Sequence, residues 1–172
     1  MPEHRIVDTN ALLVASERHD EASDQCQQNC AQFLQRVRRN VYCVVLDANG
    51  DALNEYVRYA RSRQSGDVDA LSLFLRHLSR NWSHPGRVRV VQLHMVENGN
   101  NEYIGWPLDE ELANFDPNDR KWLMIALVFQ QETDQIAPIT YAIERDWDDY
   151  RDALTRHGVA LDHLCAADRV MP

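Results

Sequence analysis

Residues 41–47 read Val-Tyr-Cys-Val-Val-Leu-Asp, an apolar run rich in β-branched residues that ends in an acid. A run of this composition predicts a strand buried on both faces, as in a parallel sheet covered by helices. The turn Asp47-Ala48-Asn49-Gly50 follows, and after it the apolar residues recur at helical spacing. The segment therefore predicts one strand-to-helix unit of an α/β fold.

Strand-like and helix-like segments alternate along the rest of the chain. Strands are expected at residues 5–8, 41–46, 88–96, 138–144 and 159–165, and helices at residues 21–39, 51–63, 68–80, 117–131 and 146–157. Thr9 or Asn10 can cap a further helix after the first strand. The alternation predicts an α/β layered fold with a mainly parallel sheet, formed by residues 1–172 as a single domain. Residues 97–114 read as an irregular connection.

Acidic residues stand where apolar runs end or helices begin. They are Asp8, Glu55, Asp119, Glu144 and Asp146. The carboxyl ends of parallel strands meet at one edge of a sheet, so these carboxylates would repel one another there unless a divalent cation bound between them. Hard oxygen ligands suit Mg²⁺ or Mn²⁺, and two such ions can activate a water and stabilise the leaving oxygen of a phosphodiester. The simpler alternatives are a helix cap for Asp119 and a solvated helix position for Glu55.

Four polar or basic residues near these acids are candidates for contacts with a substrate phosphate. They are Asn10, Arg58, Arg120 and Lys121. Capping is the competing role for Asn10, and a solvated helix face is the competing role for the three cations. Trp147, beside the last acid, is expected to pack in the core.

Four segments carry a resemblance to a known family: Val-Asp-Thr-Asn-Ala-Leu-Leu (7–13), Leu-Asn-Glu-Tyr (53–56), Asp-Arg-Lys-Trp-Leu-Met-Ile-Ala (119–126) and Ala-Ile-Glu-Arg-Asp-Trp (142–147). In this order they resemble PIN-domain proteins, which are metal-dependent ribonucleases. The run Val-Val-Leu-Asp-Ala-Asn-Gly (44–50) adds a resemblance to a bacterial PIN-like subgroup. The resemblance extends over residues 5–165 and is looser over residues 65–105.

The resemblance implies a three-layer α/β/α fold with a twisted, mainly parallel sheet and an Mg²⁺- or Mn²⁺-dependent endoribonuclease acting on single-stranded or loop RNA. By this resemblance Asp8, Glu55, Asp119 and Glu144 are the catalytic and metal-binding acids, and Asp146 is a fifth metal-binding acid. It also implies a protein partner, such as an antitoxin or the product of a neighbouring gene, or a second copy in a homodimer. Two residues depart from the family pattern: Ala142 replaces a hydroxyl residue, and Glu144 replaces the more usual Asp.

The composition limits which kinds of function and compartment this chain is expected to have. The net charge of −9 argues against holding nucleic acid by bulk electrostatics, but 17 of the 18 basic residues are Arg, which grips phosphate well. A charge at residue 3 and a strand by residue 5 leave no room for a signal peptide, and no apolar run is long enough for a membrane span, so a cytoplasmic protein is expected. Cys26 and Cys30 are either half of a metal site or small helix residues, while Cys43 and Cys165 read as core.

Two alternatives to a nuclease stay open. Val-Val-Leu-Asp-Ala-Asn-Gly-Asp (44–51) resembles the start of a haloacid-dehalogenase-type phosphatase with Asp47 as nucleophile, although Asn49 stands where the second Asp is usual. The other alternative is a PIN-like domain with an incomplete site that serves as a binding or regulatory module, supported by Ala142 and the acidic surface. No Ser/His/Asp or Cys/His triad and no glycine-rich phosphate loop is readable.

Overall fold

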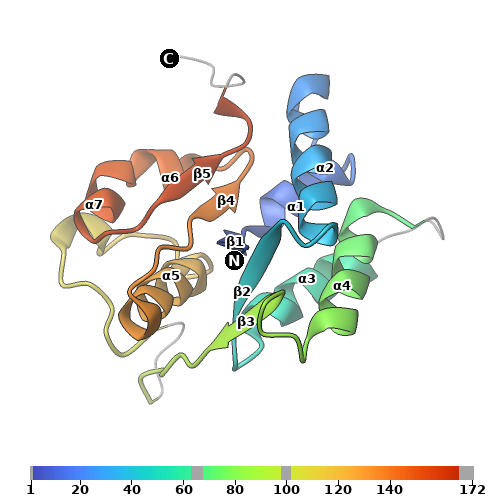
Figure 1. Ribbon diagram of the computed structural model, residues 1–172. Coiled ribbons are helices and arrows are strands. Elements are labelled where there is room, and N and C mark those ends of the chain that lie inside the picture. The colour runs from blue at the N-terminus through green and yellow to red at the C-terminus, as the bar shows by residue number, and fades with distance from the viewer. Residues whose placement is uncertain (1, 63–67, 98–101, 167–172) are drawn as a thin grey trace.

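The apolar run at residues 41–47 forms β2 (Tyr42–Asp47), all of whose side chains are buried. In the computed structural model, which describes residues 2–62, 68–97 and 102–166, β2 pairs in parallel with β1 (Glu3–Val7) and β3 (Val88–Val91). On the other side of β1 lie β4 (Ile139–Tyr141) and β5 (Leu161–His163), also parallel. The five-stranded sheet has the order β3-β2-β1-β4-β5 (Figure 1). The expected α/β fold is confirmed.

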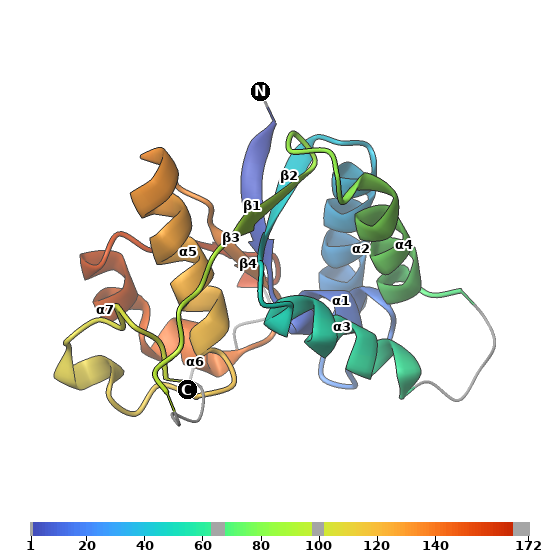
Figure 2. The same cartoon turned by 90° about the horizontal axis from the view of Figure 1, so that it is seen from below.

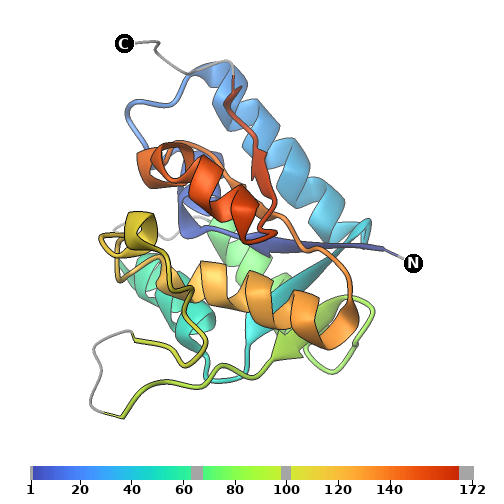
Figure 3. The same ribbon diagram turned by 90° about the vertical axis from the view of Figure 1, so that its left-hand side faces the viewer.

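Helices cover both faces of this sheet. One layer contains α1 (Thr9–Ala15), α2 (Asp24–Arg38), α3 (Asp51–Arg61) and α4 (Ala70–Asn81), and the other contains α5 (Arg120–Thr133), α6 (Arg145–Asp149) and α7 (Arg151–Arg156) (Figure 2). The second layer, coloured gold to red, faces the viewer in Figure 3. Because both faces are covered, β2 is apolar up to its final residue, Asp47. The three-layer α/β/α arrangement is confirmed.

The strand order creates one special place at the carboxyl edge of the sheet. The chain moves outward from β1 to β2 and β3, and then returns to the opposite side of β1 with β4 and β5. Where the strand order reverses, the carboxyl ends of the two neighbouring strands border a shared crevice. Ligands of open α/β sheets bind in this crevice. Asp8 directly follows β1, and its backbone N–H donates to the Thr140 carbonyl of β4 at 2.9 Å. Glu144 comes three residues after the end of β4.

Several elements differ from their expected extents. The strands expected at 138–144 and 159–165 are only Ile139–Tyr141 and Leu161–His163. The strand expected at 88–96 ends at Val91, because beyond it the Leu93 carbonyl accepts from the side-chain amide of Asn49 at 3.1 Å rather than from a strand. The helix expected at 146–157 is two helices, α6 and α7, that meet at Tyr150. Tyr150 packs against Phe115 with ring centroids 5.1 Å apart, so a tertiary contact accompanies the break.

The cysteines are arranged differently from the expectation. Cys26 in α2 forms a disulfide with Cys165, 139 residues further along the chain. Cys165 is buried as expected for core, but it lies beyond the end of β5 and is not a strand residue. Cys43 is buried in β2, as predicted.

Among the residues that the structure describes, no helix combines the length and apolar character needed to cross a bilayer.

Candidate metal centre

Asp8 is the deepest acid of the site. It is 4% exposed, at the start of α1, and one carboxylate oxygen accepts from the backbone N–H of Asn10 at 3.1 Å. The other oxygen accepts from the indole N–H of Trp147 at 2.5 Å. Burial, together with the negative charges of Glu55 and Glu144, raises the pKa of Asp8 to about 7 despite these two hydrogen bonds. Trp147 therefore does more than pack in the core, since it also orients Asp8.

Asp119 stands at the first position before α5, yet its side chain makes no capping hydrogen bond. The capping alternative is therefore wrong for the Asp119 side chain. Burial, followed by the charges of Asp8 and Glu144, raises the pKa of Asp119 to about 8, although the Lys121 ammonium opposes this rise. A carboxyl group left uncapped among other acids is placed to bind a cation.

A third acid, Asp116, joins the cluster without having been expected there. Asp116, Asp119 and Asp146 each offer a carboxylate oxygen, and these oxygens lie within 4.8 Å of one another. Asp116 stands three residues before Asp119, in a turn where the Asp119 N–H donates to the Asp116 carbonyl at 3.0 Å. The sequence signal was the Asp-Pro-Asn-Asp turn itself, which brings both acids back to the same place.

Glu144 and Asp146 enter the site from the β4–α6 connection. Burial, and next the charge of Asp146, raises the pKa of Glu144, while burial and the charge of Asp116 raise the pKa of Asp146. The backbone N–H groups of Arg145 and Asp146 oppose the rise in the pKa of Glu144, but burial and the charge of Asp146 outweigh them. Both acids therefore lie among other negative groups.

Glu55 is neutralised within the protein, in contrast to the other acids. One of its oxygens lies 2.5 Å from the Lys121 ammonium, and the other accepts from the Thr9 hydroxyl at 2.5 Å. Lys121 is the only lysine of the chain, is 7% exposed and also donates to the Asn118 carbonyl. Lys121, a predicted phosphate contact, is thus ion-paired with Glu55, a predicted metal ligand.

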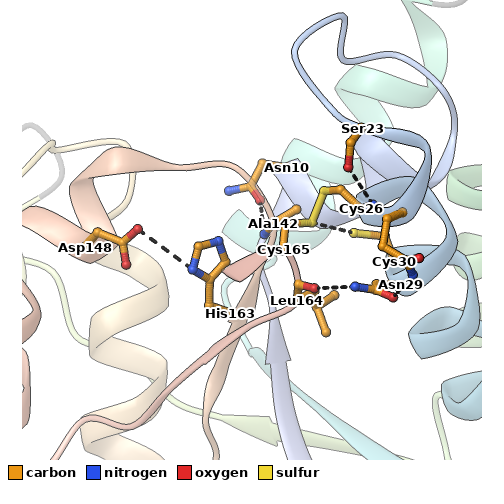
Figure 4. Close-up of a disulfide and its surroundings, with 11 residues drawn as sticks. Asn10, Ser23, Cys26, Asn29, Cys30, Ala142, Asp148, His163, Leu164 and Cys165 are labelled. Carbon is orange, nitrogen blue, oxygen red and sulfur yellow. Dashed lines mark hydrogen bonds and ion pairs between the residues drawn. A yellow bond between two sulfur atoms is a disulfide. The ribbon is translucent and has the colours of Figure 1, made fainter. Parts of the chain in front are cut away.

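Asn10 links the two strands at the reversal point. Its side-chain oxygen accepts from the Ala142 N–H at 2.7 Å, as Figure 4 shows. Its side-chain nitrogen is buried and has no hydrogen-bond partner among the residues that the structure describes. That amide is a donor available to a ligand, and it lies two residues from Asp8.

The two arginines expected at the substrate differ in their contacts. Arg58 is exposed and lines a cavity of about 280 Å³ with Asn54, Glu55 and Asn118. Arg120 instead donates to the Phe115 carbonyl at 3.3 Å and lies over the Trp106 ring at 4.9 Å. Arg58 therefore lines the cavity next to Glu55, while Arg120 stabilises the loop that precedes α5.

Asp47, the nucleophile of the phosphatase alternative, caps the start of α3 instead. It is 1% exposed, and its two oxygens accept from the backbone N–H groups of Asp51 at 2.8 Å and Ala52 at 2.9 Å. Both oxygens therefore serve the start of α3, and this bonding argues against a nucleophilic carboxylate.

The donor set fits a hard divalent cation. Burial and the neighbouring acids raise the pKa values of these carboxyl groups, so their ionised forms are unfavourable without a counter-charge, and a bound cation would supply it. Comparison of the chain with protein-family models, with curated proteins and with solved structures found no match.

Proposed function

We propose that the protein is an Mg²⁺- or Mn²⁺-dependent endoribonuclease of PIN-like type. The observation that carries the proposal is the convergence of Asp8, Asp119 and Glu144 at the strand-order reversal, with their pKa values raised by burial and by one another's charge. Hydrolysis of a phosphodiester is the reaction for which such acidic clusters hold a metal.

In this proposal Asp8, Asp119 and Glu144 hold the cation, and Asp116 and Asp146 bind it or its waters. A bound cation would lower the pKa of a water and stabilise charge on the phosphoryl oxygens. Trp147 fixes the orientation of Asp8 by its N–H, which a metal-binding carboxylate needs from its surroundings. The buried amide nitrogen of Asn10 can donate to a phosphate oxygen.

RNA is the proposed substrate, in the cytoplasm, with Arg58 on the wall of the adjacent cavity as the phosphate contact. The support for RNA is the resemblance to PIN-domain ribonucleases, which also suggests an antitoxin-like partner or a homodimer. The acidic surface favours this kind of local phosphate contact over broad electrostatic attraction.

A second candidate function has one observation in its favour. The Lys121 ammonium lies 2.5 Å from Glu55, where a metal was expected, and so supplies a positive charge from the protein itself. With Ala142 in place of a hydroxyl residue, this pairing favours a catalytically incomplete PIN-like module that binds RNA or a protein without cleaving it.

Calorimetry with Mn²⁺ and Mg²⁺ tests the metal centre directly. We expect the wild type to bind Mn²⁺ and Asp119→Asn to bind it at least about tenfold more weakly, because a ligand is lost. Asp149→Asn is the matched control, since Asp149 is an exposed acid near Asp146 and outside the ligand set. A folded wild type that binds neither ion would remove the nuclease proposal.

Cleavage of a labelled single-stranded RNA then separates the two candidate functions. We expect Mn²⁺-dependent cleavage that a chelator stops and that Asp8→Asn lowers at least about a hundredfold. Metal binding without any cleavage, together with RNA retention on a filter, would favour the binding module instead.

A further inference from the structure

Three sulfur atoms gather where α2 meets the segment after β5. Cys26 and Cys30 are one turn apart in α2, and Cys165 approaches them from the segment after β5 (Figure 4). The three sulfurs lie within 4.8 Å of one another, and all three residues are at most 1% exposed. Cys26 and Cys165 form the disulfide, and the Cys30 sulfur lies 3.8 Å from that of Cys165.

The three sulfurs form a small triangle that brings together two cysteine side chains of α2 and one from the segment after β5.

The same triangle matches the sulfur shell of a thiophilic cation. Metal–thiolate bonds of about 2.3 Å place neighbouring sulfurs roughly 3.7–4.0 Å apart. The Cys30–Cys165 separation of 3.8 Å already has this value. Among the residues that the structure describes, no fourth His, Cys, Asp or Glu joins the group, so the protein offers three thiolates.

Contacts outside the sulfurs hold the segment that carries Cys165. The side-chain amide of Asn29 in α2 donates to the Leu164 carbonyl at 2.9 Å, and the Leu164 N–H donates to the Tyr141 carbonyl of β4 at 2.9 Å. These bonds do not depend on the disulfide, so they keep Cys165 beside α2 after reduction. Cys26 lies in the first turn of α2, where the helix dipole favours a thiolate.

We propose that Cys26, Cys30 and Cys165, once reduced, form a three-thiolate site for one thiophilic cation, with Cu⁺ the better fit and Zn²⁺ next. Three thiolates complete a trigonal shell for Cu⁺, whereas Zn²⁺ takes a water as its fourth ligand. A dithiol reductant supplies two electrons and two protons to the Cys26–Cys165 bond, leaves as its own disulfide and produces two thiols. The thiols release their protons to solvent when the cation binds. The disulfide is the oxidised form, in which the metal site is closed.

Anaerobic titration of the reduced, desalted full chain with Cu⁺ against a chromogenic chelator tests this site, and Zn²⁺ forms a parallel arm. We expect one equivalent of Cu⁺ to bind the reduced wild type, and none to bind the disulfide form. Cys30→Ser leaves the disulfide pair intact, so its fold can be verified in the oxidised state, and after reduction it should bind at least about tenfold more weakly. Cys43→Ser, which removes a buried cysteine of β2, should bind like the wild type.

The Asn29→Ala variant distinguishes a metal site whose geometry the protein maintains from three thiols that are merely close to one another. It removes the amide that holds Leu164 but no sulfur, and we expect weaker binding than in the wild type. Zn²⁺ binding that shows the same variant pattern supports the thiolate site with the other cation. A reduced, folded wild type that binds neither cation better than Cys30→Ser overturns the proposal, and so does a wild type that unfolds on reduction and is not refolded by either metal. None of these readouts depends on nuclease activity.

Discussion

At the scale of single residues, opposing effects decide the charge state of each acid in the centre. Burial raises the pKa of Asp8, and the N–H groups of Trp147 and Asn10 lower it, yet the value stays at about 7. Glu55 has a cation at 2.5 Å and differs from Asp8 in having that charge supplied by the protein. Carboxylates therefore occur in two settings here: Asp8, a proposed metal ligand, lies among other acids, and Glu55 is one half of an internal ion pair.

Trp147→Phe should weaken Mn²⁺ binding about tenfold, because the ring stays while the N–H that orients Asp8 is lost. Loss of that donor also raises the pKa of Asp8 further, so the metal affinity should recover as the pH rises. Calorimetry at two pH values measures both effects. Trp122→Phe is the control, because Trp122 is buried and its indole nitrogen has no hydrogen-bond partner among the described residues. Equal effects of the two substitutions would contradict the orienting role.

Lys121→Met should lower the free energy of unfolding by about 3 kcal/mol, since it leaves the Glu55 carboxylate without its cation in a largely buried place. Adding Glu55→Gln should restore most of that loss, because the uncompensated charge is gone. Urea denaturation of the single and double variants measures the coupling. Simple additivity of the two substitutions would show that the pair does not act as a unit.

At the scale of elements, hydrogen bonds at the starts of the helices distinguish the acids that cap a helix from those that do not. Asp47 binds two N–H groups at the start of α3, whereas Asp119 binds none at the start of α5. Both acids follow or precede apolar segments, so the sequence pattern alone does not separate them. Only the hydrogen bonds show which carboxylate remains available to a ligand.

Asp47→Ala should destabilise the protein by about 2 kcal/mol, because α3 loses both bonds at its start. Ser23→Ala, which removes the side-chain oxygen that accepts from the Cys26 N–H at the start of α2, should cost about 1 kcal/mol. Chemical denaturation gives both values. Hydrolysis of a small phosphomonoester by the wild type, abolished in Asp47→Ala that remains folded, would instead restore the phosphatase alternative.

At the scale of the whole molecule, the sheet brings acids from distant segments together and accumulates negative charge at one edge. The pKa values of Asp8 and Asp119, about 7 and about 8, lie far above the ordinary value of 3.8. At pH values between the ordinary and the raised pKa, these two carboxyl groups are protonated in the folded protein and ionised in the unfolded chain. The stability of the metal-free protein should therefore fall as the pH rises through this window.

The expected fall in stability is least opposed by other groups between about pH 7 and pH 8.5. His4 and His77, whose lowered pKa values act in the opposite direction, stop contributing above their ordinary value of 6.5. With chelator present, we expect the melting temperature to fall from pH 7 to pH 8.5, and saturating Mn²⁺ should reverse the fall by binding the ionised carboxylates. Asp119→Asn should flatten the slope. A melting temperature that rises over this interval in chelator would contradict the charged-edge account.

The sequence by itself determined the layered fold and most members of the acidic cluster. Apolar runs such as residues 41–46 have to be buried on both faces, and acids at their ends have to meet wherever parallel strands end. These are local patterns with a single structural outcome, and they placed Asp8, Asp119 and Glu144 correctly at one edge of the sheet.

The tertiary structure alone decided the partners of those residues. The Lys121–Glu55 pair, the Trp147 bond to Asp8 and the Cys26–Cys165 disulfide join residues 66, 139 and 139 positions apart. Asp116 belongs to the cluster because its turn folds back on Asp119 beside Asp146. Periodicity and residue type carry no information on which side chains of different elements touch, because that depends on the register and packing of the complete sheet.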